Sequence, residues 1–119
     1  MFKKLFGGEP KPGKPINISD EEFEGEVLGS EIPVAVDFWS STCAPCQVMA
    51  GLLSELGPQL AGRVKIVKIQ VDRFAEAATR FGVRGVPTVM LFKDGKVVDS
   101  IVGLMPLNPL RERLEKLTG

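Results

Sequence analysis

Two kinds of hydrophobic pattern alternate along the first two thirds of the chain. Continuous apolar runs at 34–38 and 64–71 are rich in β-branched residues, which predicts buried strands. Apolar residues at helical spacing predict helices over 20–28, 43–61 and 74–81, the first preceded by a capping-box pattern at Ser19 and Glu22. Because helices and strands alternate, we expect an α/β fold with parallel strands.

The last third of the chain has the pattern of a hairpin and a final helix. Strands over 88–92 and 96–102 flank Asp94-Gly95, which favours a tight primed turn because glycine readily adopts positive φ. Asn108 as the cap and Pro109 at the first helical position predict a helix that follows. We therefore expect a central mixed sheet, with parallel strands plus a C-terminal antiparallel hairpin, flanked by helices on both faces.

The first 15 residues differ from the rest in being rich in glycine, proline and lysine. This composition predicts a flexible leader over 1–15 and one folded domain over 16–119. An alternative is that Phe2, Leu5 and Phe6, beside two lysines, contact a membrane surface or a partner. The start lacks an apolar core of signal-peptide length, and no apolar run is long enough to cross a membrane, so we expect a cytoplasmic protein without stable membrane insertion.

Charge and composition exclude several classes of function. The chain has 15 basic and 15 acidic residues, so its formal net charge is zero, which argues against nucleic-acid binding. It contains no histidine and only two cysteines, too few ligands for a structural zinc site. We expect neither a metal nor a cofactor.

The two cysteines form the segment Cys43-Ala44-Pro45-Cys46, directly after an apolar strand and at the start of a predicted helix. Such a pair can open and close a disulfide reversibly. The unpaired N–H groups and the dipole of a helix N-terminus stabilise a thiolate at Cys43. Cys46, one turn further on, is expected to be more covered. We therefore predict that Cys43 is the attacking thiol and Cys46 the resolving thiol.

Around these cysteines the chain resembles the thioredoxin family over residues 18–118. The resemblance is carried, in order and spacing, by Val36-Asp37-Phe38-Trp39, Cys43-x-Pro45-Cys46, Lys68, Gly85-Val86-Pro87-Thr88 and Gly103. It implies the thioredoxin fold and a thiol-disulfide oxidoreductase that reduces protein disulfides through a mixed disulfide at Cys43. It also implies a monomer that accepts electrons from a thioredoxin reductase or a similar donor.

The resemblance further implies how a substrate is held. Pro87 corresponds to a cis-proline that faces the disulfide, and the backbone of Val86 would pair with an extended substrate segment. Trp39 corresponds to the family's active-site tryptophan; the alternative is a core tryptophan, and the two roles are compatible. An apolar patch would surround the sulfurs, formed by Ala44, Pro45, Val71, Gly85, Val86, Gly103 and Leu104.

Asp37 is an acid inside an apolar strand, where an unpaired charge is costly. It resembles the family's buried acid, whose desolvation would raise its pKa and let it accept the proton of Cys46. Lys68 matches a family lysine that would moderate this shift. The alternatives are that Asp37 faces the solvated side of the strand and that Lys68 is exposed, as Lys65 is expected to be.

Four residues depart from the family pattern. Thr42 replaces a common second tryptophan, Ala44 a glycine, Gln47 a frequent lysine and Gly51 a proline. We expect Thr42 to reduce the substrate contact surface and Gln47 to remove a positive charge that favours the thiolate. Two other functions stay open: a thiol oxidase or isomerase, and a binding module that uses the groove without turnover. The absence of histidine near the cysteines favours a reductant.

Overall fold

The computed structural model describes residues 12–119, so residues 1–11 and the contact predicted there for Phe2, Leu5 and Phe6 lie outside the described part. The described chain has the strands β1 (Ile16–Asn17), β2 (Val34–Trp39), β3 (Lys65–Gln70), β4 (Thr88–Lys93) and β5 (Lys96–Val102). Its helices are α2 (Asp20–Phe23), α3 (Ala44–Gln59), α4 (Glu76–Arg80) and α5 (Leu107–Glu115), with a π-helix η1 (Glu24–Leu28) and a 3-10 turn η2 (Lys116–Thr118).

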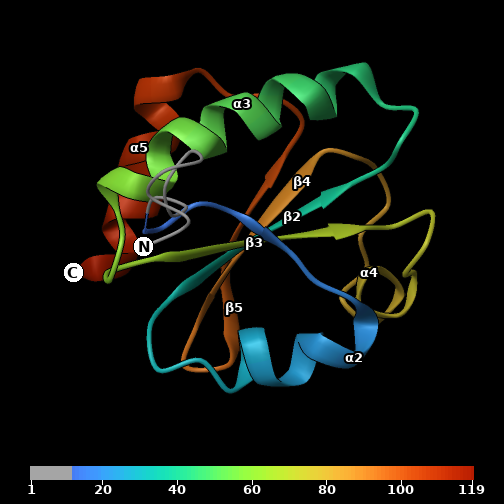
Figure 1. The fold of residues 1–119 in the computed structure, drawn as a ribbon, viewed down its shortest axis with the longest axis horizontal. Coiled ribbons are helices and arrows are strands. Elements are labelled where there is room, and N and C mark those ends of the chain that lie inside the picture. Colours follow the sequence, from blue (N-terminus) through green and yellow to red (C-terminus); the bar gives the residue numbers. More distant parts are fainter. Residues whose placement is uncertain (1–11) are drawn as a thin grey trace, which may run out of the picture.

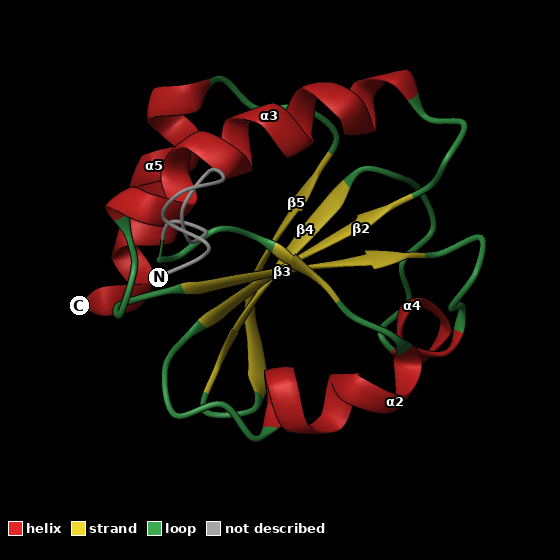
Figure 2. Cartoon of the chain, viewed as in Figure 1, coloured by secondary structure: helices red, strands yellow, loops and turns green. Residues whose placement is uncertain are grey.

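The strands form one mixed sheet in the order β1-β3-β2-β4-β5. β1, β3 and β2 are parallel, whereas β4 is antiparallel to β2 and β5 is antiparallel to β4. Helices α3 and α5 cover one face of the sheet, and α2 and α4 cover the other (Figures 1 and 2). The predicted α/β class and mixed sheet are confirmed. Among the strands of residues 12–119, β1 was not predicted, because two residues are too short to show a pattern.

Each face of the sheet has its own core, because side chains alternate along a strand. Toward α3 and α5, Ala35 and Leu91 pack with Met49 and Leu53 of α3 and with Leu110 of α5. Toward α2 and α4, Phe38 and Val67 belong to a second cluster. In that cluster the rings of Phe23, Phe81 and Phe92 lie within 5.2–5.9 Å of one another, centroid to centroid.

The first helix begins as predicted but does not stay α-helical. The capping box is present, since Ser19 N donates to Glu22 Oε1 at 2.9 Å. After Phe23 the backbone widens into η1, and Gly29 N donates to Glu24 O at 2.8 Å, five residues earlier. The predicted helix over 20–28 is therefore one turn of α-helix followed by a π-helical turn.

The predicted start of the last helix is wrong. α5 begins at Leu107 with Pro106 as its N-cap, so Asn108 is not the cap and Pro109 is the third helical residue. The first helical bond runs from Leu110 N to Pro106 O at 3.0 Å. Like the N–H at the first helical position, the N–H at the third has no intrahelical partner. Proline, which lacks an N–H, therefore costs the helix no hydrogen bond there.

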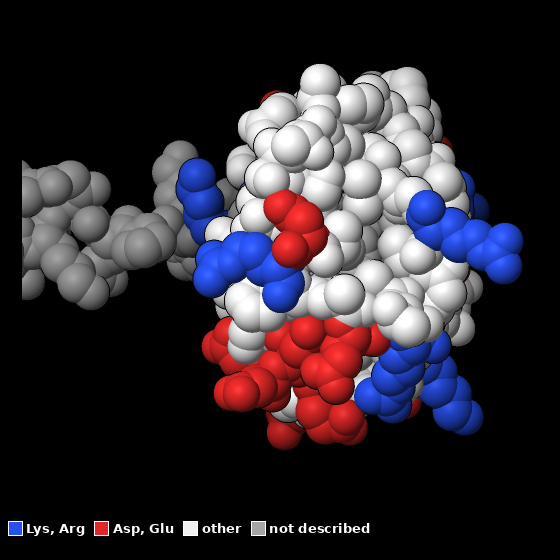
Figure 3. Space-filling model, turned by 90° about the vertical axis from the view of Figure 1, so that its right-hand side faces the viewer, with Lys and Arg blue, Asp and Glu red and all other residues white. Residues whose placement is uncertain are grey.

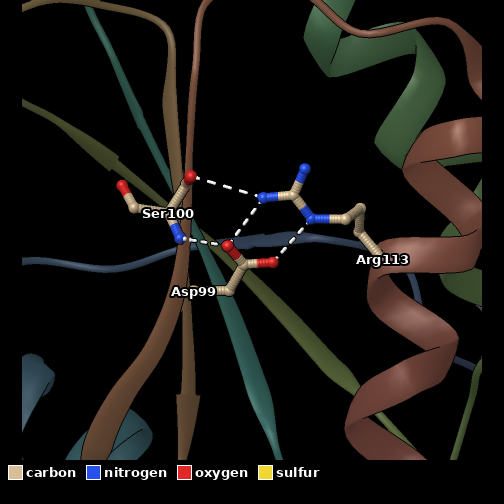
Figure 4. A network of polar contacts seen from close by, with 3 residues as sticks. All are labelled: Asp99, Ser100 and Arg113. Carbon is tan, nitrogen blue, oxygen red and sulfur yellow. Dashed lines mark hydrogen bonds and ion pairs between the residues drawn. The ribbon is translucent and has the colours of Figure 1, made fainter.

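A bidentate ion pair ties α5 to the edge strand β5 (Figure 4). Arg113 Nε donates to Asp99 Oδ2 and Arg113 Nη2 to Asp99 Oδ1, each at 2.6 Å. These hydrogen bonds from Arg113 hold the pKa of Asp99 below its ordinary value.

In the turn between β4 and β5, Asp94 and Gly95 have φ of 52° and 76°, which confirms the predicted primed turn.

Two glycines of α3 lie in opposite surroundings. A Cβ at Gly51 would meet no atom within 4 Å, whereas a Cβ at Gly57 would collide with the carbonyl oxygen of Gly13. Gly57 thus lets residues 12–15, the described end of the predicted leader, lie directly on α3.

We therefore predict opposite effects of alanine at the two positions. Gly51→Ala should raise the free energy of unfolding by about 0.5–1 kcal/mol, because alanine is the better helix former and the site has room. Gly57→Ala should lower it by about 1–3 kcal/mol, because the new methyl group overpacks the contact with Gly13. Urea unfolding of both variants tests this, and a gain in stability for Gly57→Ala would contradict the described contact.

Candidate functional site

Cys43 and Cys46 form a disulfide at the junction between β2 and α3. Cys43 is the N-cap of α3, and its sulfur accepts a hydrogen bond from Cys46 N at 3.1 Å. Cys43 is half-buried, whereas Cys46 is only 2% exposed. Pro45 occupies the second helical position, where its missing N–H has no consequence. Of the two cysteines, Cys43 is the more accessible.

The topology brings the predicted groove residues to the same end of the sheet. β2 leads into Thr42 and Ala44, and β3, parallel to it, leads into Val71. β4 is antiparallel to β2, so the Gly85–Pro87 segment before its first residue lies at this end too. β5 returns to the same end, since Val102 pairs with Thr88, and places Gly103 and Leu104 there.

The Val86–Pro87 peptide bond is cis, as the resemblance implied. Two hydrogen bonds hold the segment: Gly103 N donates to Pro87 O at 2.8 Å, and Thr88 Oγ1 donates to Gly85 O at 2.6 Å. Val71, Val83 and Val86 line a hollow of 240 Å³ beside it, together with Arg84. Exposed apolar surface continues at Leu104, which is 49% exposed.

Asp37 is buried on the α3 side of the sheet. It has no exposed surface, so the alternative of a solvated position is excluded. Ala35, two residues earlier and on the same face, packs with Met49 and Leu53 of α3. Because β2 runs toward the start of α3, Asp37 lies closer than Ala35 to the first turn of α3. Cys46 is buried on the same side of α3 as Met49 and Leu53, one and two turns before them.

Burial raises the pKa of Asp37 from 3.8 to about 7, and the charge of Lys68 limits the increase. Lys68 is the register partner of Asp37 on β3 and is half-buried, unlike a freely exposed lysine. Its Nζ lies 5.1 Å from the centre of the Trp39 ring. Within residues 12–119 neither carboxyl oxygen of Asp37 has a hydrogen-bond partner. A carboxyl group in this position can hold a proton at neutral pH.

The surface around this end of the sheet is unevenly charged. Figure 3 faces the end at which β2 and β3 finish, and acidic side chains gather at the bottom of that view, where α2 lies in Figure 1. Asp20, Glu21, Glu22 and Glu24 belong to this part of the chain. The upper part of the view is largely uncharged.

A polar contact beside the cysteines was not foreseen from the sequence. Asp72 follows β3 and accepts hydrogen bonds from Ser41 N at 3.2 Å and Ser41 Oγ at 2.6 Å. Gln70 Nε2 also donates to Asp72, at 3.2 Å. Two polar residues 31 positions apart carry no pairing signal in a single sequence. The signal that could have found this contact is position: Ser41 and Asp72 each lie two residues after one of two neighbouring parallel strands.

Comparison with known proteins agrees with this geometry. The family model described as Thioredoxin matches residues 14–116. The chain belongs to the thioredoxin family. It is 41% identical over 99 residues to "Thioredoxin 1" of Nostoc sp., covering 83% of this chain and 92% of that protein. It is 45% identical over 95 residues to "Thioredoxin" of Haemophilus influenzae, covering 80% and 89%.

A solved thioredoxin structure shares the same fold. A mutant thioredoxin from Halobacterium salinarum superposes with a TM-score of 0.82 at 32% identity, over 94% of this chain and 97% of the other. Together with the Cys43–Cys46 pair, membership of the thioredoxin family makes this chain a thiol-disulfide oxidoreductase that reduces protein disulfides. Family members act on disulfide substrates and are reduced in turn by a reductase. In the described part of the chain, no helix could span a membrane.

The buried carboxyl group gives a test of the site through stability. The folded protein keeps the Asp37 proton up to about pH 7, whereas the unfolded chain loses it near 3.8. Between these values the unfolded state binds fewer protons, so the free energy of unfolding should fall as pH rises, by about 4 kcal/mol in all. This contribution is complete below pH 3.8 and is lost by about pH 7.

Urea unfolding of the oxidised protein from pH 4 to 8 measures the effect. Asp37→Asn should lack this decline, while Asp94→Asn, an isosteric change in the exposed hairpin turn, should retain it. Parallel pH profiles for wild type and Asp37→Asn would show that Asp37 titrates normally.

Proposed function

We propose that this chain reduces protein disulfides by a two-step exchange in which Cys43 attacks and Cys46 resolves. The observation that carries the assignment is the difference in exposure, since Cys43 is half-buried at the helix start and Cys46 is only 2% exposed. An incoming disulfide can reach the sulfur of Cys43, and the helix N-terminus stabilises the thiolate there.

The proposed reaction consists of two thiol-disulfide exchanges. The Cys43 thiolate attacks one sulfur of the substrate disulfide, forming a mixed disulfide and releasing the first substrate thiolate. Cys46 then attacks the Cys43 sulfur, closes the Cys43–Cys46 disulfide and releases the second thiolate. Two electrons pass to the substrate, and a thioredoxin reductase or similar donor restores the dithiol.

The second step requires Cys46 to lose its proton in a buried place. We assign that proton to the carboxylate of Asp37, which lies on the same side of α3 and has a pKa of about 7. Lys68 limits that pKa, because its charge favours the carboxylate. Without Lys68 the carboxyl group would hold its proton to a higher pH.

Substrate binding is assigned to the groove between the loops. The backbone of Val86, before the cis bond to Pro87, would pair with an extended substrate segment. The apolar surface beside it comes from Trp39, Thr42, Ala44, Pro45, Val71, Gly85, Gly103 and Leu104. Thr42 offers less contact area than a tryptophan, so substrates would be held chiefly by Val71, Val86 and Leu104. We place the protein in the cytoplasm as a monomer.

Trapping of the mixed disulfide tests the order of the two cysteines. Cys46→Ser should accumulate a covalent complex with insulin, because the bond to Cys43 forms but is not resolved. Non-reducing electrophoresis detects the complex. Cys43→Ser is the matched variant and should trap nothing, so a stable complex with that variant would reverse the assignment.

The rate of exchange tests the role of Asp37. Asp37→Asn should slow insulin reduction at pH 7 by at least about 10-fold, because the amide cannot accept the proton of Cys46. The deficit should shrink above about pH 9, where the thiol ionises without help. Asp94→Asn serves as the control. An unchanged rate at pH 7 would remove Asp37 from the mechanism.

A further inference from the structure

The loop that presents Cys43 is held from one side by a carboxylate. Ser41 lies two residues before Cys43, and Asp72 lies in the turn after β3. Asp72 Oδ1 accepts from Ser41 N at 3.2 Å, and Asp72 Oδ2 accepts from Ser41 Oγ at 2.6 Å. We call this pair of contacts the Ser41–Asp72 clamp.

The two loops joined by the clamp differ in their own support. The turn after β3 is held by backbone bonds from Arg73 N and Phe74 N to Gln70 O, at 3.1 and 2.8 Å. The turn bond of the cysteine loop, from Cys43 N to Ser40 O, is long at 3.4 Å. The better-held loop therefore anchors the weaker one through Asp72.

Asp72 is itself oriented and ionised. Gln70 Nε2 donates to Oδ2 of Asp72 at 3.2 Å, which fixes the carboxylate against the end of β3. The hydrogen bonds from Ser41 are the main reason that the pKa of Asp72 lies below its ordinary value. Hydrogen bonds to a charged acceptor are stronger than neutral ones, so the clamp can hold even at the surface.

The clamp connects two walls of the proposed groove. The cysteine loop carries Thr42 and Cys43, and the turn after β3 begins with Val71, whose N–H donates to Trp39 O at 2.8 Å. This backbone bond follows the last register pair of β2 and β3, Trp39 and Gln70. The clamp joins the two segments just after it. The clamp is thus a side-chain contact between the loop of Thr42 and the turn of Val71, beyond the last backbone bond that joins the two strands.

We propose that Ser41 and Asp72 are positioning residues that set the Cys43 loop against the groove, and so serve protein substrates rather than disulfide exchange in general. The inference rests on the proposed groove. A substrate chain docked along Val71 and Val86 reaches Cys43 only if the cysteine loop and the turn after β3 are correctly placed relative to each other. A small disulfide touches the sulfur without using the walls, so its exchange does not need the clamp.

The test compares two substrates in single-turnover reactions of the reduced, full-length protein at pH 7. Insulin is the protein substrate, and 2-hydroxyethyl disulfide is the small neutral one. Asp72→Ala should slow insulin reduction about 5- to 10-fold, and Ser41→Ala about 3-fold, since it keeps the bond from its N–H. Both variants should react with the small disulfide within about 2-fold of wild type.

Two further variants are controls, one for the loss of a negative charge and one for the action of Ser41 and Asp72 through the same clamp. Glu112→Ala removes the same charge from an exposed position on α5 and should leave both rates unchanged. The double variant Ser41→Ala/Asp72→Ala should be no slower with insulin than Asp72→Ala, because Asp72→Ala already removes the hydrogen bond that Ser41→Ala would break.

Each alternative outcome has a distinct meaning. Equal slowing with both substrates would assign Asp72 to the chemistry of Cys43 or to general folding and overturn the positioning role. Unchanged insulin rates in both single variants would overturn it as well. Failure of the wild type to reduce insulin would instead refute the proposed function.

Discussion

The site depends on a carboxyl group that the fold keeps out of water. Asp37 has no exposed surface, and it stands on β2 among side chains that pack against α3. A group in this position is stable mainly as the neutral acid near pH 7 and below, which is why its pKa rises. Stability is thereby lost at neutral pH, and the chain gains the carboxyl group that we propose as the acceptor for the Cys46 proton.

The rest of the architecture places reactive groups around that strand. β2 is the central strand, with β3 and β4 paired along its two edges, and its side chains are buried in the core clusters on both faces. Its carboxyl end turns directly into α3, which makes Cys43 both the end of a loop and the cap of a helix. The antiparallel β4 returns the cis bond before Pro87 to the same end. The two cysteines, the buried acid Asp37 and the Val86 backbone proposed to bind substrate thus come from adjacent elements.

Much of this could be predicted from the sequence because the signals were local or motif-based. The apolar runs of β2 and β3, the Asp94-Gly95 turn and the Cys43–Cys46 pair each depend on a few neighbouring residues. The π-helical turn at Glu24–Leu28 could not be predicted, because it differs from an α-helix by one hydrogen-bond step. Pro109 misled the prediction of α5, since proline fits the third helical position as well as the first. The Ser41–Asp72 clamp escaped because its partners meet only after β2 and β3 have paired.

The protonation of Asp37 is the most direct test of this account. Carbon-13 NMR of the side-chain carboxyl carbons can follow each aspartate of the oxidised protein from pH 3 to 10, with Asp37→Asn assigning the signal. The account predicts that the Asp37 signal changes with a midpoint near pH 7. A midpoint near 3.8 would mean that the carboxyl group is ionised at neutral pH without cost, and would contradict its role as the acceptor for Cys46.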